Sequence, residues 1–145
     1  MLAAAAEPAF ADPLPDGGAT APEIAGVMKG QDFPVETAKD KDGNPLLRSS
    51  AQGYGFSVYF YGCKETRCDS IQFSAAFTSK DVKPEKVAEW NRTRRFGRAW
   101  LDDDAAPWVE MDVDLEHGAT TEAVAADLER WVSVLTGFNS FLEQH

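Results

Sequence analysis

Histidine and cysteine are scarce in this sequence, and their scarcity excludes several kinds of active site. The 145 residues include two histidines, His117 and His145, and two cysteines, Cys63 and Cys68. A four-ligand zinc site built from these residue types would need all of them, including the last residue of the chain. They also form no Ser-His-Asp or Cys-His arrangement. We therefore expect no metal, no cofactor and no catalytic residue.

Long apolar runs and, in the second half, basic residues are also lacking. The apolar runs fall far short of the roughly 18 residues that a membrane helix needs, so we expect no membrane span. The net charge is −10, and from residue 97 onward the only basic residues are Arg98 and Arg130. Such an acidic surface repels phosphates, which argues against nucleic acid as a partner.

The length and composition fit one globular domain. Residues 1–19 are rich in alanine and proline and have no helical or strand period. Ala4–Ala6 before Glu7 and Ala9–Ala11 before Asp12 have the small-x-small form of a signal-peptidase site. We interpret residues 1–19 as a disordered tail and the remnant of an export signal, with a plain alanine-rich tail as the alternative. Residues 20–145 form the predicted single domain. An export signal predicts a periplasmic or secreted location for the protein.

Hydrophobic periodicity predicts an α+β fold in which helices pack on an antiparallel sheet. Thr20 is the expected cap of the first helix, Asp40–Asn44 forms a turn, and Thr120 caps the last helix. The expected order is α-β-β-β-β-α-β-β-α, over residues 20–30, 33–38, 46–50, 56–63, 69–77, 84–94, 98–102, 108–115 and 120–143.

The two cysteines flank the turn of a predicted hairpin. If Cys63 lies opposite Cys68, then Phe60 lies opposite Ile71 and the apolar faces of both strands coincide. The cysteines then lie on the other, more polar face. This agreement between turn and pattern predicts the register.

Three states of the cysteine pair remain open from sequence. A structural disulfide across the turn would stabilise the fold by only about 2 kcal/mol, because the loop is short. It would fit an exported protein. The alternatives are two free thiols and a redox-active pair, which would make the protein a thiol-redox enzyme. Redox pairs usually place the first thiol at a helix N-terminus, whereas Cys63 and Cys68 lie on strands.

The second hairpin has an acidic outer side. Strict alternation predicts four opposed pairs: Leu101 with Val109, Ala99 with Met111, Arg98 with Asp112, and Trp100 with Glu110. The acidic side chains are Asp102, Asp103, Asp104, Glu110, Asp112 and Asp114. We interpret them as a solvated face, with cation binding as an alternative function.

The last helix has the longest apolar stripe in the chain. Its members recur at helical spacing: Val124, Leu128, Trp131, Leu135, Phe138 and Leu142, with Val132 and Phe141 beside them. This pattern predicts a helix packed on the sheet. Its length and breadth also allow a homodimer contact.

Five segments carry a family resemblance: Asp42–Leu46, Gly55–Phe60 with Cys63, Trp90–Arg92, Arg95–Ala99 and Glu110–Leu115. Together they resemble the YbjN family, whose members are described as bacterial sensory transduction regulators. The resemblance covers about residues 20–144. The family is similar in fold to type III secretion chaperones, which bind segments of other proteins. The resemblance implies no catalytic residues.

The resemblance implies a non-enzymatic, protein-binding or regulatory module with a chaperone-like fold. Its partner is another protein, which the sequence does not identify. We expect the partner surface on the arginine-bearing segment and the acidic strand, with Trp90, Asn91, Arg95, Arg98 and Asp112 as the candidate residues.

Overall fold

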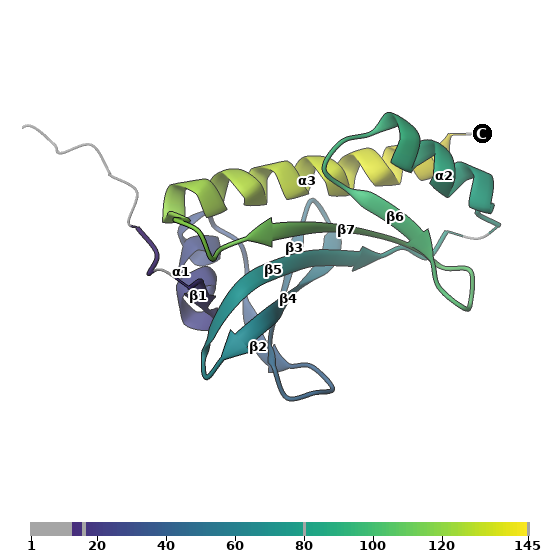
Figure 1. Ribbon diagram of the computed structural model, residues 1–145. Coiled ribbons are helices and arrows are strands. Elements are labelled where there is room, and N and C mark those ends of the chain that lie inside the picture. The colour runs from purple at the N-terminus through teal and green to yellow at the C-terminus, as the bar shows by residue number, and fades with distance from the viewer. Residues whose placement is uncertain (1–12, 16, 80, 145) are drawn as a thin grey trace, which may run out of the picture.

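Helices pack on one face of an antiparallel sheet, as predicted for an α+β fold. The computed structural model describes residues 13–15, 17–79 and 81–144, and these form a seven-stranded sheet and three helices (Figure 1). The helices are α1 (Ala21–Gly30), α2 (Pro84–Thr93) and α3 (Thr121–Glu143). The strands are β1 (Ala19–Thr20), β2 (Glu36–Lys39), β3 (Pro45–Ala51), β4 (Tyr54–Lys64), β5 (Arg67–Ala76), β6 (Arg98–Leu101) and β7 (Pro107–Asp114).

The strand order is β2-β3-β4-β5-β7-β6, with each pair antiparallel. The short strand β1 pairs with Arg67 and Cys68 of β5, beyond the point where β7 ends. The helix N-termini form as expected, because the hydroxyl oxygens of Thr20 and Thr120 accept hydrogen bonds from backbone N–H groups three residues ahead.

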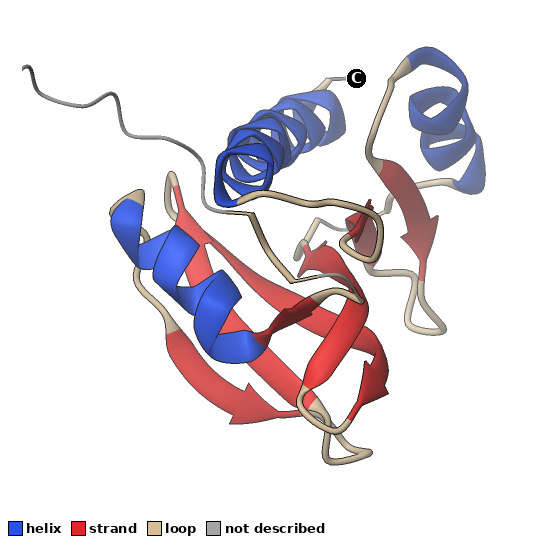
Figure 2. Cartoon of the chain, turned by 60° about the vertical axis from the view of Figure 1, so that its left-hand side comes forward, coloured by secondary structure: helices blue, strands red, loops and turns tan. Residues whose placement is uncertain are grey.

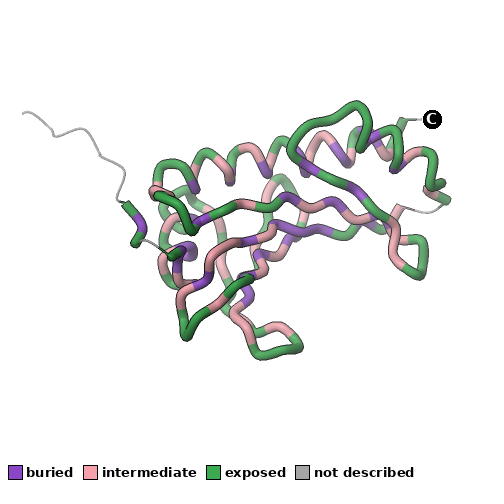
Figure 3. The backbone as a smooth tube through the Cα atoms, in the orientation of Figure 1, coloured by how far each residue is buried: buried purple, intermediate pink, exposed green. Residues whose placement is uncertain are grey.

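Helix α3 runs along the sheet and supplies the centre of the core (Figures 1 and 2). Trp131 is fully buried, and its ring stacks on Phe73 at 5.6 Å and meets the edge of Phe56 at 5.9 Å. Exposed residues lie mainly on the side of α3 that faces away from the sheet (Figure 3). In the described part of the chain, none of the helices combines the length and apolarity needed to cross a membrane.

The structure describes residues 13–15 and 17–19 of the segment predicted as a tail, and part of this segment packs on the domain. Leu14 and Ala19 are buried, and the Leu14 N–H donates to the Ala119 carbonyl at 2.9 Å. Backbone hydrogen bonds to other parts of the chain help to hold this segment in place. Such bonds do not require a periodic pattern of apolar side chains, so no signal for them is visible in the sequence. Both candidate cleavage sites, Ala4–Ala6 and Ala9–Ala11, lie outside the described residues.

The cysteine hairpin has the predicted register, with Cys63 opposite Cys68 and Phe60 opposite Ile71. The two cysteines form a disulfide. Cys68 is buried although it lies on the side expected to be polar. Ala19 of β1 lies opposite Cys68 and is fully buried as well.

The predicted register of the second hairpin is wrong by two residues. Arg98 lies opposite Glu110, and Trp100 lies opposite Trp108. The loop is shorter than the sequence suggested, because the Asp102 carboxylate accepts hydrogen bonds from the N–H groups of Asp104 and Ala106, both at 2.9 Å. A two-residue shift keeps each side chain on its predicted face.

Candidate functional site

The sheet face opposite α1 and α3 carries a mixed aromatic and charged surface, which we call the outer face. It comprises Leu46, Tyr59, Tyr61, Gln72, Arg98, Trp100, Trp108, Glu110 and Asp112, which alternate with the core residues of the same strands. Tyr61 is 49% exposed and Trp100 is 40% exposed. Exposed tyrosine and tryptophan side chains are candidates for partner contact, because these residue types are enriched at protein interfaces.

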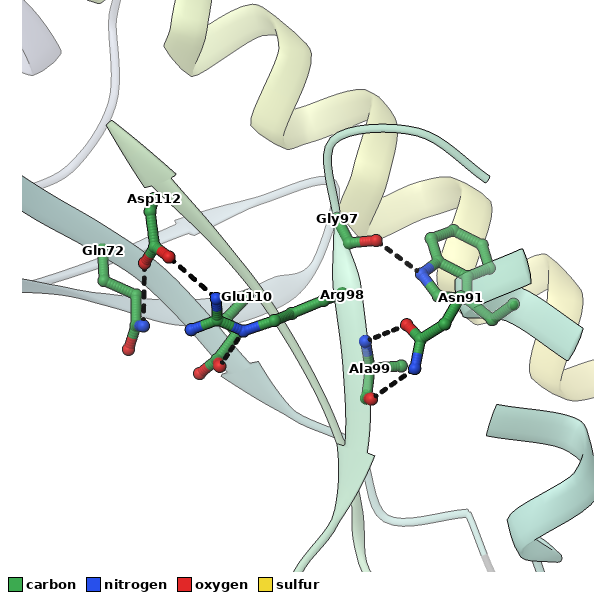
Figure 4. Close-up of polar contacts among 8 residues, drawn as sticks. Gln72, Asn91, Gly97, Arg98, Ala99, Glu110 and Asp112 are labelled. Atoms are coloured by element: carbon green, nitrogen blue, oxygen red, sulfur yellow. Dashed lines mark hydrogen bonds and ion pairs between the residues drawn. The ribbon is translucent and has the colours of Figure 1, made fainter. Parts of the chain in front are cut away.

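Arg98 organises the centre of the outer face (Figure 4). Its Nε donates to Glu110 Oε1 at 2.7 Å, and a terminal nitrogen donates to Asp112 Oδ2 at 2.9 Å. The other Asp112 oxygen accepts from the Gln72 amide at 2.9 Å. The hydrogen bond to Glu110 raises the pKa of Arg98 further, so its charge is constant. The network fixes the direction of the two exposed side chains, Arg98 and Asp112.

Aromatic residues flank this network on both sides. The rings of Trp100 and Trp108 stack at 5.4 Å, and the Trp108 indole N–H donates to Asp102 at 2.9 Å. That bond, followed by the one from the Ala106 N–H, lowers the pKa of Asp102. On the other side, partial burial and then the nearby Glu110 carboxylate raise the pKa of Tyr61.

Trp90, predicted as a partner contact, is instead a core residue. It is 2% exposed, its ring meets Phe138 edge-on at 5.0 Å, and its Nε1–H donates to the Gly97 carbonyl at 3.0 Å. The sequence placed it on the surface because it stands beside arginines. The Trp90 side chain points into the core because it lies on the apolar stripe of α2.

Asn91 also has an internal role. Its amide nitrogen donates to the Ala99 carbonyl at 3.0 Å, and its amide oxygen accepts from the Ala99 N–H at 2.7 Å (Figure 4). These Ala99 groups point away from β7, toward the outside of the sheet. Asn91 and Trp90 therefore cover the edge of β6 in place of a further strand.

The remaining three predicted residues fall on two different surfaces. Arg98 and Asp112 lie together on the outer face, whereas Arg95 lies in the loop after α2, with its guanidinium 4.9 Å from the ring centre of Phe96. Tyr61, Trp100 and Phe96 were not among the residues predicted from the sequence. For Tyr61 and Trp100 a signal was present, because each is an aromatic residue at a polar position of an alternating strand.

Of the six acidic residues considered for cation binding, Asp114 lies in a cluster with Glu116 and His117, whose possible ligand atoms lie within 4.8 Å of one another. All three residues are exposed. Asp114 already accepts hydrogen bonds from the Glu116 N–H and from the His117 ring. These bonds lower the pKa of Asp114, and the bond to Asp114 raises the pKa of His117. Internal bonding accounts for the cluster without a cation.

Comparison with known proteins gives one family. Residues 20–144 match a family model, YbjN, with the description "Putative bacterial sensory transduction regulator". Neither the curated proteins nor the solved structures gave a match. The matched region includes both the outer face and the segment from Trp90 to Ala99.

Proposed function

The chain belongs to the YbjN family, and we propose that it acts as a regulatory module that binds another protein through its outer face. This proposal takes its regulatory character from the family description. It names no reaction, because the family is described as a regulator and not by a catalytic activity.

The observation that carries the proposal is the exposure of Tyr61 and Trp100 around the Arg98 network. Tyrosine, tryptophan and arginine supply most of the binding energy at protein interfaces, especially near the interface centre. Here Arg98 is held in place by Glu110 and Asp112, so little side-chain entropy is lost when a partner binds. A rigid polar centre with aromatic flanks is a suitable docking surface.

We also propose an oxidising compartment, the periplasm or the exterior, and a chaperone-like mode of binding. The disulfide supports the compartment, because such bonds persist mainly outside the cytosol. Removal of the chain before Asp12 would leave the packed residues from Pro13 onward intact. The chaperone-like mode rests on the family resemblance, and binding through the outer face is the form it would take here.

A redox role for the cysteines has less support. Cys68 has no accessible surface, and both residues lie on strands of a hairpin and not on a helix. Exchange needs a sulfur that an incoming thiolate can reach and a site that stabilises the thiolate. Burial of Cys68 and the strand setting favour a structural disulfide.

Site-specific photo-cross-linking tests the outer face. A photoreactive phenylalanine analogue replaces Tyr61 or Trp100 in one set of variants and exposed Arg92 of α2 in the control. We expect the same cross-linked protein at both outer-face positions and none at position 92. Equal cross-linking at all three positions would reject the outer face as the docking surface.

A further inference from the structure

A groove lies between α3 and the loop that joins α2 to β6, apart from the outer face. Figure 1 shows this loop arching over α3. The groove has a volume of about 620 Å³ and is lined by Arg94, Arg95, Phe96, Glu129, Arg130 and Val134, among others. We call it the Phe96 groove. Its floor is apolar and its rim is basic, in a chain whose net charge is −10.

Phe96 is held outward by an unusual backbone conformation. Its φ is +73°, and the Gly97 N–H donates to the Arg95 carbonyl at 2.9 Å, which closes a three-residue turn around it. A bulky residue rarely adopts this conformation, and such positions are concentrated at functional sites. The Phe96 side chain is nevertheless 55% exposed. Core packing therefore does not explain why a phenylalanine stands here.

The surrounding structure fixes this turn. The Gly97 carbonyl accepts from the Trp90 indole, and Gly97 packs so closely on α3 that a Cβ there would lie 2.4 Å from Val134 Cγ1. The turn is therefore held from both sides. Phe96 is presented on a rigid support, as is typical of a binding residue.

The arginines of the groove are available for an anionic partner. In the part of the chain that the structure describes, ion pairs join other basic residues to carboxylates, but none involves Arg94 or Arg95. Both guanidinium groups lie over aromatic rings instead, Arg94 at 5.5 Å from Trp90 and Arg95 at 4.9 Å from Phe96. Arg130 lies 4.5 Å from the Phe96 ring and pairs with Asp127.

Stacking on a ring uses the flat face of a guanidinium group and leaves its N–H edge free. That edge can donate two parallel hydrogen bonds to one carboxylate. In the Phe96 groove, Glu129 is the one acidic residue among the lining residues, against three arginines. The charge balance favours carboxylates, and the exposed Phe96 ring favours an adjacent apolar side chain.

We propose that the Phe96 groove binds an acidic segment of a partner protein, with carboxylates on Arg94 and Arg95 and an apolar side chain on Phe96. This site is separate from the outer face and does not depend on the function proposed for it. The strongly acidic surface elsewhere repels such a segment, so binding is confined to the groove.

Fluorescence anisotropy with a labelled peptide of alternating glutamate and leucine tests this proposal. We expect saturable binding at low salt that weakens as salt is added. Arg95→Glu should weaken it by about tenfold or more, since it replaces a charge-assisted hydrogen bond by a repulsion. Arg92→Glu makes the same charge change on α2 outside the groove and should cost less than about threefold. Equal losses in the two variants, or no binding by wild type, would overturn the proposal.

Two further variants identify the surface and the occupant. Phe96→Gly should abolish peptide binding while the protein stays folded, because glycine accepts the positive φ. Trp100→Ser alters the outer face and should bind the peptide as wild type does. Loss of peptide binding in this variant would show that the peptide binds at the outer face, and it would overturn the proposal. A dimer in sedimentation that Arg95→Glu dissociates would also overturn it, because a second copy would then fill the groove.

Discussion

At the scale of single residues, Asn91 holds the edge of β6 through two hydrogen bonds to Ala99. Asn91→Ala removes both and leaves two backbone groups without their partner. We predict a free energy of unfolding lower by about 1–3 kcal/mol, since a hydrogen bond contributes about 0.5–1.5 kcal/mol net. Urea denaturation measures it, with Arg92→Ala as the neighbouring control. An unchanged midpoint in Asn91→Ala would show that water replaces the amide at no cost.

His117 provides a pH-dependent contact at the same scale. Its pKa lies above the ordinary 6.5, chiefly because of the hydrogen bond to Asp114. A raised pKa in the folded state means that the contact stabilises the fold fully below the unfolded pKa. The stabilisation is lost as the pH rises through the folded pKa.

We predict that Asp114→Asn moves the His117 pKa down toward 6.5. An NMR titration of the imidazole protons measures this shift, and His145 serves as the internal comparison. A His117 pKa that is the same in wild type and variant would show that the contact does not form in solution.

At the scale of elements, the glycine that precedes β1 and the glycine inside α1 respond in opposite ways to an added methyl group. Gly18 has φ of +117°, and a Cβ there would lie 1.8 Å from the Cys68 carbonyl oxygen. Gly26, inside α1, has no atom within 4 Å of a Cβ. We predict that Gly18→Ala lowers the free energy of unfolding by about 2 kcal/mol or more. Gly26→Ala should raise it by about 0.5–1 kcal/mol.

Urea unfolding of both variants measures these opposite changes. Each variant is the control for the other, because the same methyl group is added. A stable Gly18→Ala protein would mean that β1 does not pair with β5 in solution.

The disulfide stabilises one hairpin and not the domain. It closes a loop from Cys63 to Cys68, so reduction should lower the free energy of unfolding by about 2 kcal/mol with the fold retained. Mass spectrometry before and after reduction shows whether two hydrogen atoms are gained. Urea denaturation with and without reductant gives the energy. Complete unfolding on reduction would contradict this local role.

Elements with a strong hydrophobic period were predictable from the sequence, and the short strand without such a period was not. The β4–β5 register followed from alternation, because a one-residue slip would expose Phe60 and Ile71. Alternation cannot exclude a two-residue slip, so the β6–β7 register depended on the Asp102 loop and was predicted wrongly. Strand β1 has no periodic pattern and was missed.

The candidate site was predictable only in part for a related reason. The alternation correctly predicted that Arg98 and Asp112 share one face of the sheet, but it paired Arg98 with Asp112 and not with Glu110. The hydrogen bonds of Trp90 to Gly97 and of Asn91 to Ala99 depend on where β6 lies relative to α2, which is a tertiary feature. Phe96 depends on a backbone turn that no sequence period indicates.

At the scale of the whole molecule, the apolar stripe of α3 is used inside the domain. Leu128, Trp131 and Leu135 are buried against the sheet, which leaves partly exposed Val132 as the main remnant of the stripe. The homodimer contact suggested by the helix therefore has little apolar surface left. We predict that Val132→Glu leaves the mass in sedimentation equilibrium unchanged. A dimer that this substitution dissociates would restore α3 as the contact.

The covered edge of β6 has a consequence for polymerisation. A sheet grows into a filament only if both of its edges accept new strands. In the described part of the chain no strand pairs with the outer side of β2, whereas Trp90 and Asn91 occupy the outward groups of Gly97 and Ala99. If two copies joined through their β2 edges, the combined sheet would end in a covered β6 edge on each side. No third copy could then add a strand. Asn91 thereby limits strand addition to a single step.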